Sequence, residues 1–282
     1  MHRVFGIAVT CVWLAAMAAL VYRDIVPTWT AQSPPQVLTD VSWNAARKSQ
    51  SRILDARDHE IGGTWSVLQP TGDHFRFEST VVFEKLPMLP PVRIETTMTL
   101  LSDGSVDEFD LAVFGIQDMF GKPLKIEMKG ESYGRYIPCT LQIGPFQRSF
   151  KLDAAASRLI GDGIRPFDVL RDLKVGQSWR MQMLDPLSAI LYQQARIIPV
   201  IARVERQEHR EYDGEQILCF LVSAGRTQAW VAPDGRVREQ QADVPGLGRL
   251  RILADNDYDE GKREKARRIG QNRSAPPATK SS

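Results

Sequence analysis

The sequence lacks the residue patterns from which several common active sites are built. No GxxxxGK[ST] or GxGxxG pattern occurs, so nucleotide binding is not expected. Gly130-Glu131-Ser132-Tyr133-Gly134 matches the Gly-x-Ser-x-Gly pattern, but it lies between two strand-like runs and not between a strand and a helix, so a serine hydrolase is not expected. Only four of the 282 residues are histidine, and His59-Glu60 lacks the second histidine that a zinc-binding HExxH helix needs. We therefore predict no catalytic residue, no metal and no cofactor.

Cysteine is scarce as well, with three in the whole chain. Cys11 lies in an apolar N-terminal run, so only Cys139 and Cys219 could pair. Both lie in apolar strand-like runs, where an unpaired cysteine commonly behaves as a small buried hydrophobic residue. Two free thiols are the favoured interpretation, and a Cys139–Cys219 disulfide is the alternative.

The net charge of +2 is unevenly distributed along the chain. Residues 261–282 carry seven Lys or Arg against Glu264 alone, which leaves about −4 on the rest. A mildly acidic body offers no basic face for a phosphate backbone, so nucleic-acid binding is not expected. The tail has too little apolar surface to fold and is predicted to be disordered.

Residues 4–22 form a long uncharged apolar run at the N-terminus. As a helix this run would reach across the roughly 30 Å hydrocarbon core of a bilayer. We predict a single-pass anchor over residues 1–24 in a bacterial inner membrane, with the N-terminus cytoplasmic and the main domain periplasmic or extracellular. The alternative is a signal peptide cleaved near Ala16-Met17-Ala18, and both interpretations export the domain.

The segment 25–58 is predicted to be a stalk followed by a short helix. Residues 25–37 contain three prolines and no regular period, which is typical of an extended linker. Residues 38–58 are predicted to be helical, with Asp40 or Ser42 as the N-cap and Ile53 facing inward.

Residues 59–260 carry the signals of antiparallel strands. Residues 74–83 alternate apolar and polar side chains, as a half-buried strand does. Asp103-Gly104 and Asp234-Gly235 each lie between two strand-like runs, a strong hairpin signal. We predict a mainly β protein with one large curved antiparallel sheet, open or half-barrel, and one or two short covering helices, one of them at 186–196.

One internal similarity suggests that the domain contains two related halves, 60–152 and 175–255. TTMTLLSDGSVDE at 96–108 aligns without gaps with TQAWVAPDGRVRE at 227–239, and the elements GGTW (62–65) and GQSW (176–179) precede them. The alternative is that any two Asp-Gly hairpins look alike over so short a stretch.

Large aromatic side chains are the remaining candidates for ligand binding. Their default role is core packing, but on the concave face of a curved sheet they would line a lipophilic groove. The candidate residues are Trp65, Phe75, Phe77, Phe83, Trp179 and Trp230.

The motifs GGTW, LKVGQSW, VERQE and AWVAPDGRVRE resemble those of uncharacterised bacterial envelope families with a WVDxxGxVLR-type hairpin. More distantly, the pattern is similar to the LolA/LolB-like lipoprotein-carrier half-barrels. The resemblance covers roughly residues 60–255. It implies a curved antiparallel sheet with lipid or hydrophobic-ligand binding and carries over no catalytic residue. The anchor departs from the pattern of a diffusing carrier.

These observations predict a non-enzymatic, membrane-anchored envelope protein. It would bind a lipid or other hydrophobic ligand, or act as an accessory subunit. One alternative is a purely structural scaffold of an envelope transport or secretion complex, and another is an unrecognised hydrolase. The sequence predicts neither the ligand or partner nor the oligomeric state.

Overall fold

The structure is a computed structural model that describes residues 2–20, 46–86, 90–102, 105–117, 121, 124–153, 160–162, 170–185, 196–244 and 247–269. In this part of the chain fifteen strands form one sheet. The strands are β1 (Arg47–Leu54), β2 (Glu60–Thr71), β3 (His74–Phe83), β4 (Val92–Leu101), β5 (Val106–Phe114), β6 (Ile126–Glu131), β7 (Tyr136–Ile143), β8 (Phe146–Asp153), β9 (Ile160–Asp162), β10 (Ser178–Asp185), β11 (Arg196–Tyr212), β12 (Glu215–Ala224), β13 (Thr227–Val231), β14 (Val237–Val244) and β15 (Gly248–Ala254).

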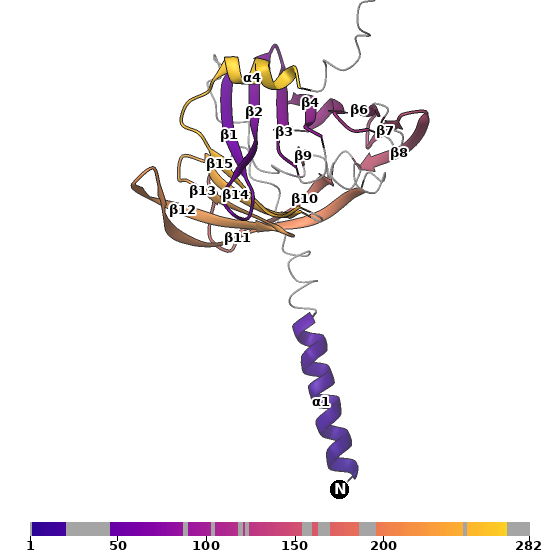
Figure 1. Cartoon of the computed structure of the whole chain (residues 1–282). Helices are drawn as coiled ribbons and strands as arrows, with labels where there is room; N and C mark the ends of the chain where they lie inside the picture. The colour runs from indigo at the N-terminus through magenta and orange to yellow at the C-terminus, as the bar shows by residue number, and fades with distance from the viewer. Residues whose placement is uncertain are drawn as a thin grey trace, which may run out of the picture.

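The sheet consists of two meanders that meet in its middle. The first runs outward from β1 to β8, and the second returns from β9 at the opposite edge to β15, which pairs with β1. Neighbouring strands are antiparallel except for β9, which is parallel to β10. Figure 1 shows a strongly bent sheet, with β11 running across the lower end of β1 to β3. The predicted mainly β fold with a large, open antiparallel sheet is confirmed.

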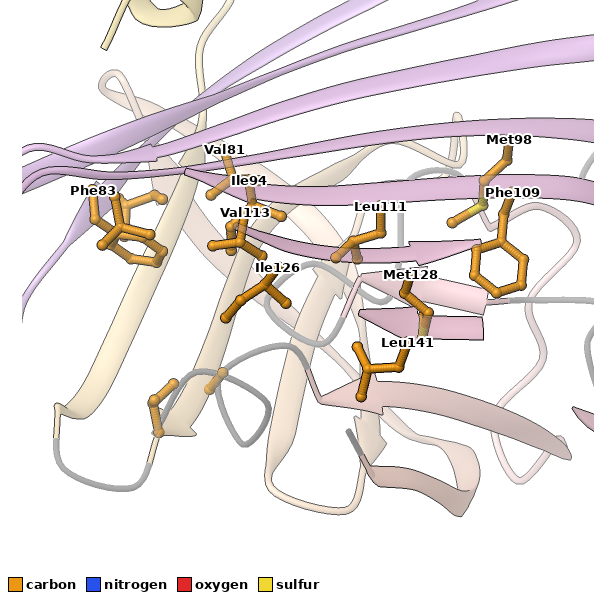
Figure 2. Close-up of a cluster of buried hydrophobic side chains, with 14 of the residues drawn as sticks. Val81, Phe83, Ile94, Met98, Phe109, Leu111, Val113, Ile126, Met128 and Leu141 are labelled. Atoms are coloured by element: carbon orange, nitrogen blue, oxygen red, sulfur yellow. The ribbon is translucent and has the colours of Figure 1, made fainter. Parts of the chain in front are cut away.

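The core lies on one face of this sheet, called here the inner face. Alternation along each strand places one set of side chains on it, as on β5, where Phe109, Leu111 and Val113 are buried. One apolar cluster extends from β7 through β1 to β14, and Figure 2 shows part of it. A second cluster fills the inner face of β10 to β14 and includes Trp179 and Val222.

The predicted disordered tail begins instead as a helix, α4 (Glu260–Arg267), which covers β2 and β3 on the opposite, outer face. The Asp259 carboxylate caps α4 by accepting a hydrogen bond from the backbone N–H of Lys262 at 3.0 Å. Ala266 packs in a cluster with Trp65 and Val82. This apolar contact orders a segment whose composition alone indicated disorder, and residues 270–282 lie outside the described residues.

The helix predicted over 38–58 is wrong for the described part of that segment. Residues 47–54 form β1, which hydrogen-bonds to β2 on one side and to β15 on the other. Gln50, Ser51 and Ile53 are buried there. Polar residues at buried positions hid the strand alternation, and pairing on both sides outweighs the local helix preference.

Two other predicted helices have different outcomes. The N-terminal run forms helix α1 (His2–Leu20). Within the described residues, however, no helix is both long and apolar enough to cross a membrane. The covering helix predicted at 186–196 lies outside the described residues except for Arg196, which begins β11.

The two similar hairpins of the sequence share the same backbone arrangement. Each contains a bulge at the same aligned position, with Asp107 of β5 as the extra residue opposite Thr99 and Leu100, and Arg238 of β14 as the extra residue opposite Trp230 and Val231. Each turn is closed by an equivalent hydrogen bond, 2.8 Å from the Leu101 N–H to the Ser105 carbonyl and 2.9 Å from the Ala232 N–H to the Arg236 carbonyl.

The preceding GGTW and GQSW elements do not extend this match. GGTW lies on β2, two strands before β4, whereas GQSW leads into β10, three strands before β13. The equivalence is therefore limited to the hairpins, and two similar halves stay a prediction.

Candidate functional site

The six aromatic candidates do not line one groove. Phe83, Phe77 and Trp179 belong to the inner face, where they pack in or against two apolar clusters. Trp65 and Trp230 lie on the outer face, in separate clusters with α4 and with Cys219. Phe75 is half-buried near the start of β3, on the same face as Phe77. Ligand binding by these residues stays a prediction.

The thiols and histidines show no reactive arrangement. All three cysteines lie in described segments and are free. Cys139 and Cys219 are buried, and burial raises the pKa of both thiols, that of Cys139 to about 11. His59 is exposed, with Nδ1 3.5 Å from an Asp55 carboxylate oxygen. Across the described ranges no group of three His, Cys, Asp or Glu could hold a metal ion.

A closed charge cluster surrounds Glu239 on the outer face of β14. Its side chain is only 2% exposed. It accepts hydrogen bonds from Arg210 Nη2 and Gln241 Nε2, both at 2.8 Å, and from Arg251 Nε at 3.1 Å. Burial alone would raise the pKa of Glu239, but these hydrogen bonds and the two arginine charges outweigh burial and lower it.

Trp230 completes this closed cluster. The guanidinium carbon of Arg210 lies 4.4 Å from the centroid of its ring, a cation–π contact. The indole N–H donates to a Glu208 carboxylate oxygen at 2.6 Å. Because each of these charged groups has a partner inside the cluster, the cluster stabilises the fold and leaves no charge for a ligand.

The outer face of β3 to β6 has an open polar groove instead. Its volume is about 400 Å³. Four carboxylates and one arginine line it together with small side chains. The lining residues are Arg76, Glu95, Thr97, Thr99, Glu108, Asp110, Ala112 and Glu127. We call this surface the outer groove.

Glu108 is the carboxylate of the outer groove that forms no ion pair within the described residues, although the charge of Lys129 acts on it from a distance. Asp110 and Glu127 pair with lysines of the sheet, at 2.9 Å and 2.7 Å. Glu108 pairs with no residue that the structure describes, and the strand register places it directly opposite Glu131 of β6. Like charges directly opposite each other destabilise a sheet. The arrangement is therefore suited to a positively charged group from another molecule.

Glu108 and Glu239 occupy equivalent positions in the two hairpins. Glu108 is registered with Thr99, and Glu239 with Trp230, each directly beside the bulge. One carboxylate is held by two arginines, whereas the other is exposed in a groove. One backbone design thus supports a closed cluster in one half of the sheet and an open groove in the other.

The sequence prediction missed the residues of both sites. The available signal was the alternation of charged residues on the solvent side of the strands, as in residues 106–112 and 236–241. Arg210 and Glu239 are brought together by strand pairing across the sheet, so their proximity has no local sequence signal.

Comparisons with known proteins assign the chain to no family. No family model matches it, and no curated protein matches it. It is similar to the solved structure of a DUF1089 family protein from Pseudomonas aeruginosa, with 17% sequence identity and a TM-score of 0.32, over 65% of this chain and 90% of the other. A similarity this distant carries no functional argument. The resemblance to envelope families and to LolA/LolB-like half-barrels stays a prediction.

Proposed function

We propose that the protein is a non-enzymatic accessory subunit that binds a macromolecular partner on the outer groove. The observation that carries the proposal is Glu108, which forms no ion pair within the described residues and faces Glu131 across β5 and β6 in an open groove. A partner segment bearing Lys or Arg would relieve this repulsion on binding. Buried thiols with raised pKa values and an exposed His59 are consistent with a role without bond chemistry.

The apolar alternative has less support among the described residues. Lipid binding was predicted from aromatic side chains gathered on a concave face, but these side chains are divided between the two faces. The described inner face is packed by its own apolar residues. The accessory or scaffold role is therefore the better-supported choice, and the envelope location stays a prediction from the N-terminal run.

The test compares partner recovery by the full-length chain and by two charge-reversal variants. Tagged wild-type protein, Glu108→Lys and Glu215→Lys are crosslinked in cells and purified. Glu215 is an exposed residue of β12, so its reversal changes the net charge equally without touching the groove. We expect one partner to be recovered with wild type and Glu215→Lys and lost with Glu108→Lys.

Two results would contradict the proposal. Equal recovery of the partner with both variants would show that the outer groove does not bind it. Stoichiometric lipid in all three samples, with no protein partner, would favour the hydrophobic-ligand alternative instead.

A further inference from the structure

Arg93 of β4 is a buried charge without a hydrogen-bond partner. Its side chain is 0% exposed, and none of its three guanidinium nitrogens forms a hydrogen bond within the described chain. The guanidinium carbon lies 4.0 Å from the centroid of the Phe114 ring. The nearest carboxylate oxygen, of Glu95, is 3.5 Å from Nε. A guanidinium has five N–H donors, and burying them unused is unfavourable.

Three further arginines lie on the outer face around the carboxylate of Glu78, and one of them, Arg267, is near enough for its charge to act on Arg93. Arg263 and Arg267 of α4 donate to the same Glu78 oxygen at 2.8 Å and 3.2 Å. Arg76 of β3 donates to the other oxygen at 3.0 Å. We call Arg76, Arg93, Arg263 and Arg267 the α4 arginine cluster.

The α4 arginine cluster has four guanidinium groups and four neighbouring carboxylates, since Glu260 and Glu264 of α4 pair with Arg263 and Arg267 at 3.3 Å and 3.5 Å. Among the described residues only Arg93 of the cluster forms no hydrogen bond. On the side of the sheet its four guanidinium groups share only Glu78 and Glu95. The two acidic residues of α4, Glu260 and Glu264, have side chains 48% and 53% exposed, so water screens their charges. Burial lowers the pKa of Arg93, the charge of Glu95 opposes this shift, and the charge of Arg267 adds to it.

We propose that the α4 arginine cluster binds an oxyanion, a phosphate or a carboxylate group, with Arg93 as the residue that holds it. The planar fork of a guanidinium matches two oxygens of either group, and the Phe114 ring fixes the plane of the fork. Arg267, on the last turn of α4 and 36% exposed, adds a second cation from the solvent side. The bound oxyanion supplies the acceptors that Arg93 lacks.

The test measures thermal unfolding of the full-length chain in inorganic phosphate and in acetate, at constant ionic strength with chloride as the reference. For wild type we expect the Tm to rise by about 5 °C or more when the anion concentration is one hundred times its Kd. In Arg93→Met the affinity falls at least about tenfold, because hydrogen bonds to a charged group are lost. Arg236→Met, which removes an exposed arginine of the other hairpin, keeps the wild-type response.

The two anions separate the possible ligands. A Tm that rises in phosphate alone identifies the ligand as a phosphate group. A Tm that rises in acetate identifies it as a carboxylate group. No rise with either anion in wild type, or equal rises in wild type and Arg93→Met, overturns the proposal. If Arg93→Met does not fold, Arg267→Gln replaces it, and an affinity unchanged from wild type then overturns the proposal.

Discussion

The two Asp-Gly hairpins show how one backbone arrangement can support opposite surfaces. In β13–β14 Trp230 faces Glu239 beside the bulge, and Glu239 is held by Arg210 and Arg251. In β4–β5 Thr99 faces Glu108 beside the bulge, and Glu108 forms no ion pair within the described residues. The backbone therefore sets where the carboxylate lies, and the neighbouring side chains decide whether it stabilises the fold or remains open to a partner.

The largest expected effect comes from truncating Trp230 and Thr99, the residues that face the two carboxylates. Trp230→Ala should cost about 4 kcal/mol, because a 5% exposed indole leaves a cavity and Glu208 and Arg210 lose their contacts with it. Thr99→Ala should change stability by less than about 0.5 kcal/mol, since its side chain borders an open groove. Urea unfolding of both variants measures the difference, and equal losses would show that the hairpins are not differently packed.

Removing the charge of Glu239 should have the next largest effect. Glu239→Gln leaves Arg210 and Arg251 without their buried partner. The free energy of unfolding should fall by about 3 kcal/mol at pH 7. This is the lower end of the range for removing one partner of a buried ion pair, because both arginines remain partly solvated.

The loss should also depend on pH. The pKa of Glu239 is lowered in the folded state, so its stabilisation is complete above the unfolded pKa of about 4.3 and disappears as the pH falls through the lower folded value. Unfolding curves of wild type and Glu239→Gln should converge below about pH 4. A difference in unfolding free energy between wild type and Glu239→Gln that stays constant down to pH 2 would show that the Glu239 carboxylate does not provide this stabilisation.

The smallest expected effect is at Glu108 and has the opposite sign. Glu108→Gln removes the repulsion from Glu131 and should stabilise the isolated protein by about 0.5 kcal/mol. The same variant should bind the partner less tightly, because the groove loses a charge. A destabilised Glu108→Gln would mean that Glu108 has a structural role like that of Glu239.

The fold was predictable where one face of a strand is apolar and the turn residues are distinctive. Residues 74–83 and the two Asp-Gly hairpins meet both conditions, and all form strands as predicted. β1 fails the first condition, because its buried residues include Gln50 and Ser51. α4 was missed because its few apolar residues are ordered by contact with Trp65 and Val82, which lie far away in the sequence.

The sites were less predictable than the fold for a related reason. Whether Arg210 reaches Glu239 depends on strand pairing and on the bulge between Val204 and Arg206 in β11, and a sequence pattern specifies neither. The prediction placed six aromatic residues on one concave face because strand order was unknown. A single bulge reverses the face on which later residues lie.

The most direct test of the central claim places a photo-crosslinking residue at Thr97 or at Gln228, the aligned positions of the two hairpins. Both residues lie on the outer face, Thr97 in the outer groove and Gln228 outside it on β13. Illumination of cells carrying the full-length chain should crosslink a protein partner at Thr97 and none at Gln228. Equal crosslinking at both positions, or none at Thr97, would contradict the assignment of the outer groove as the partner-binding surface.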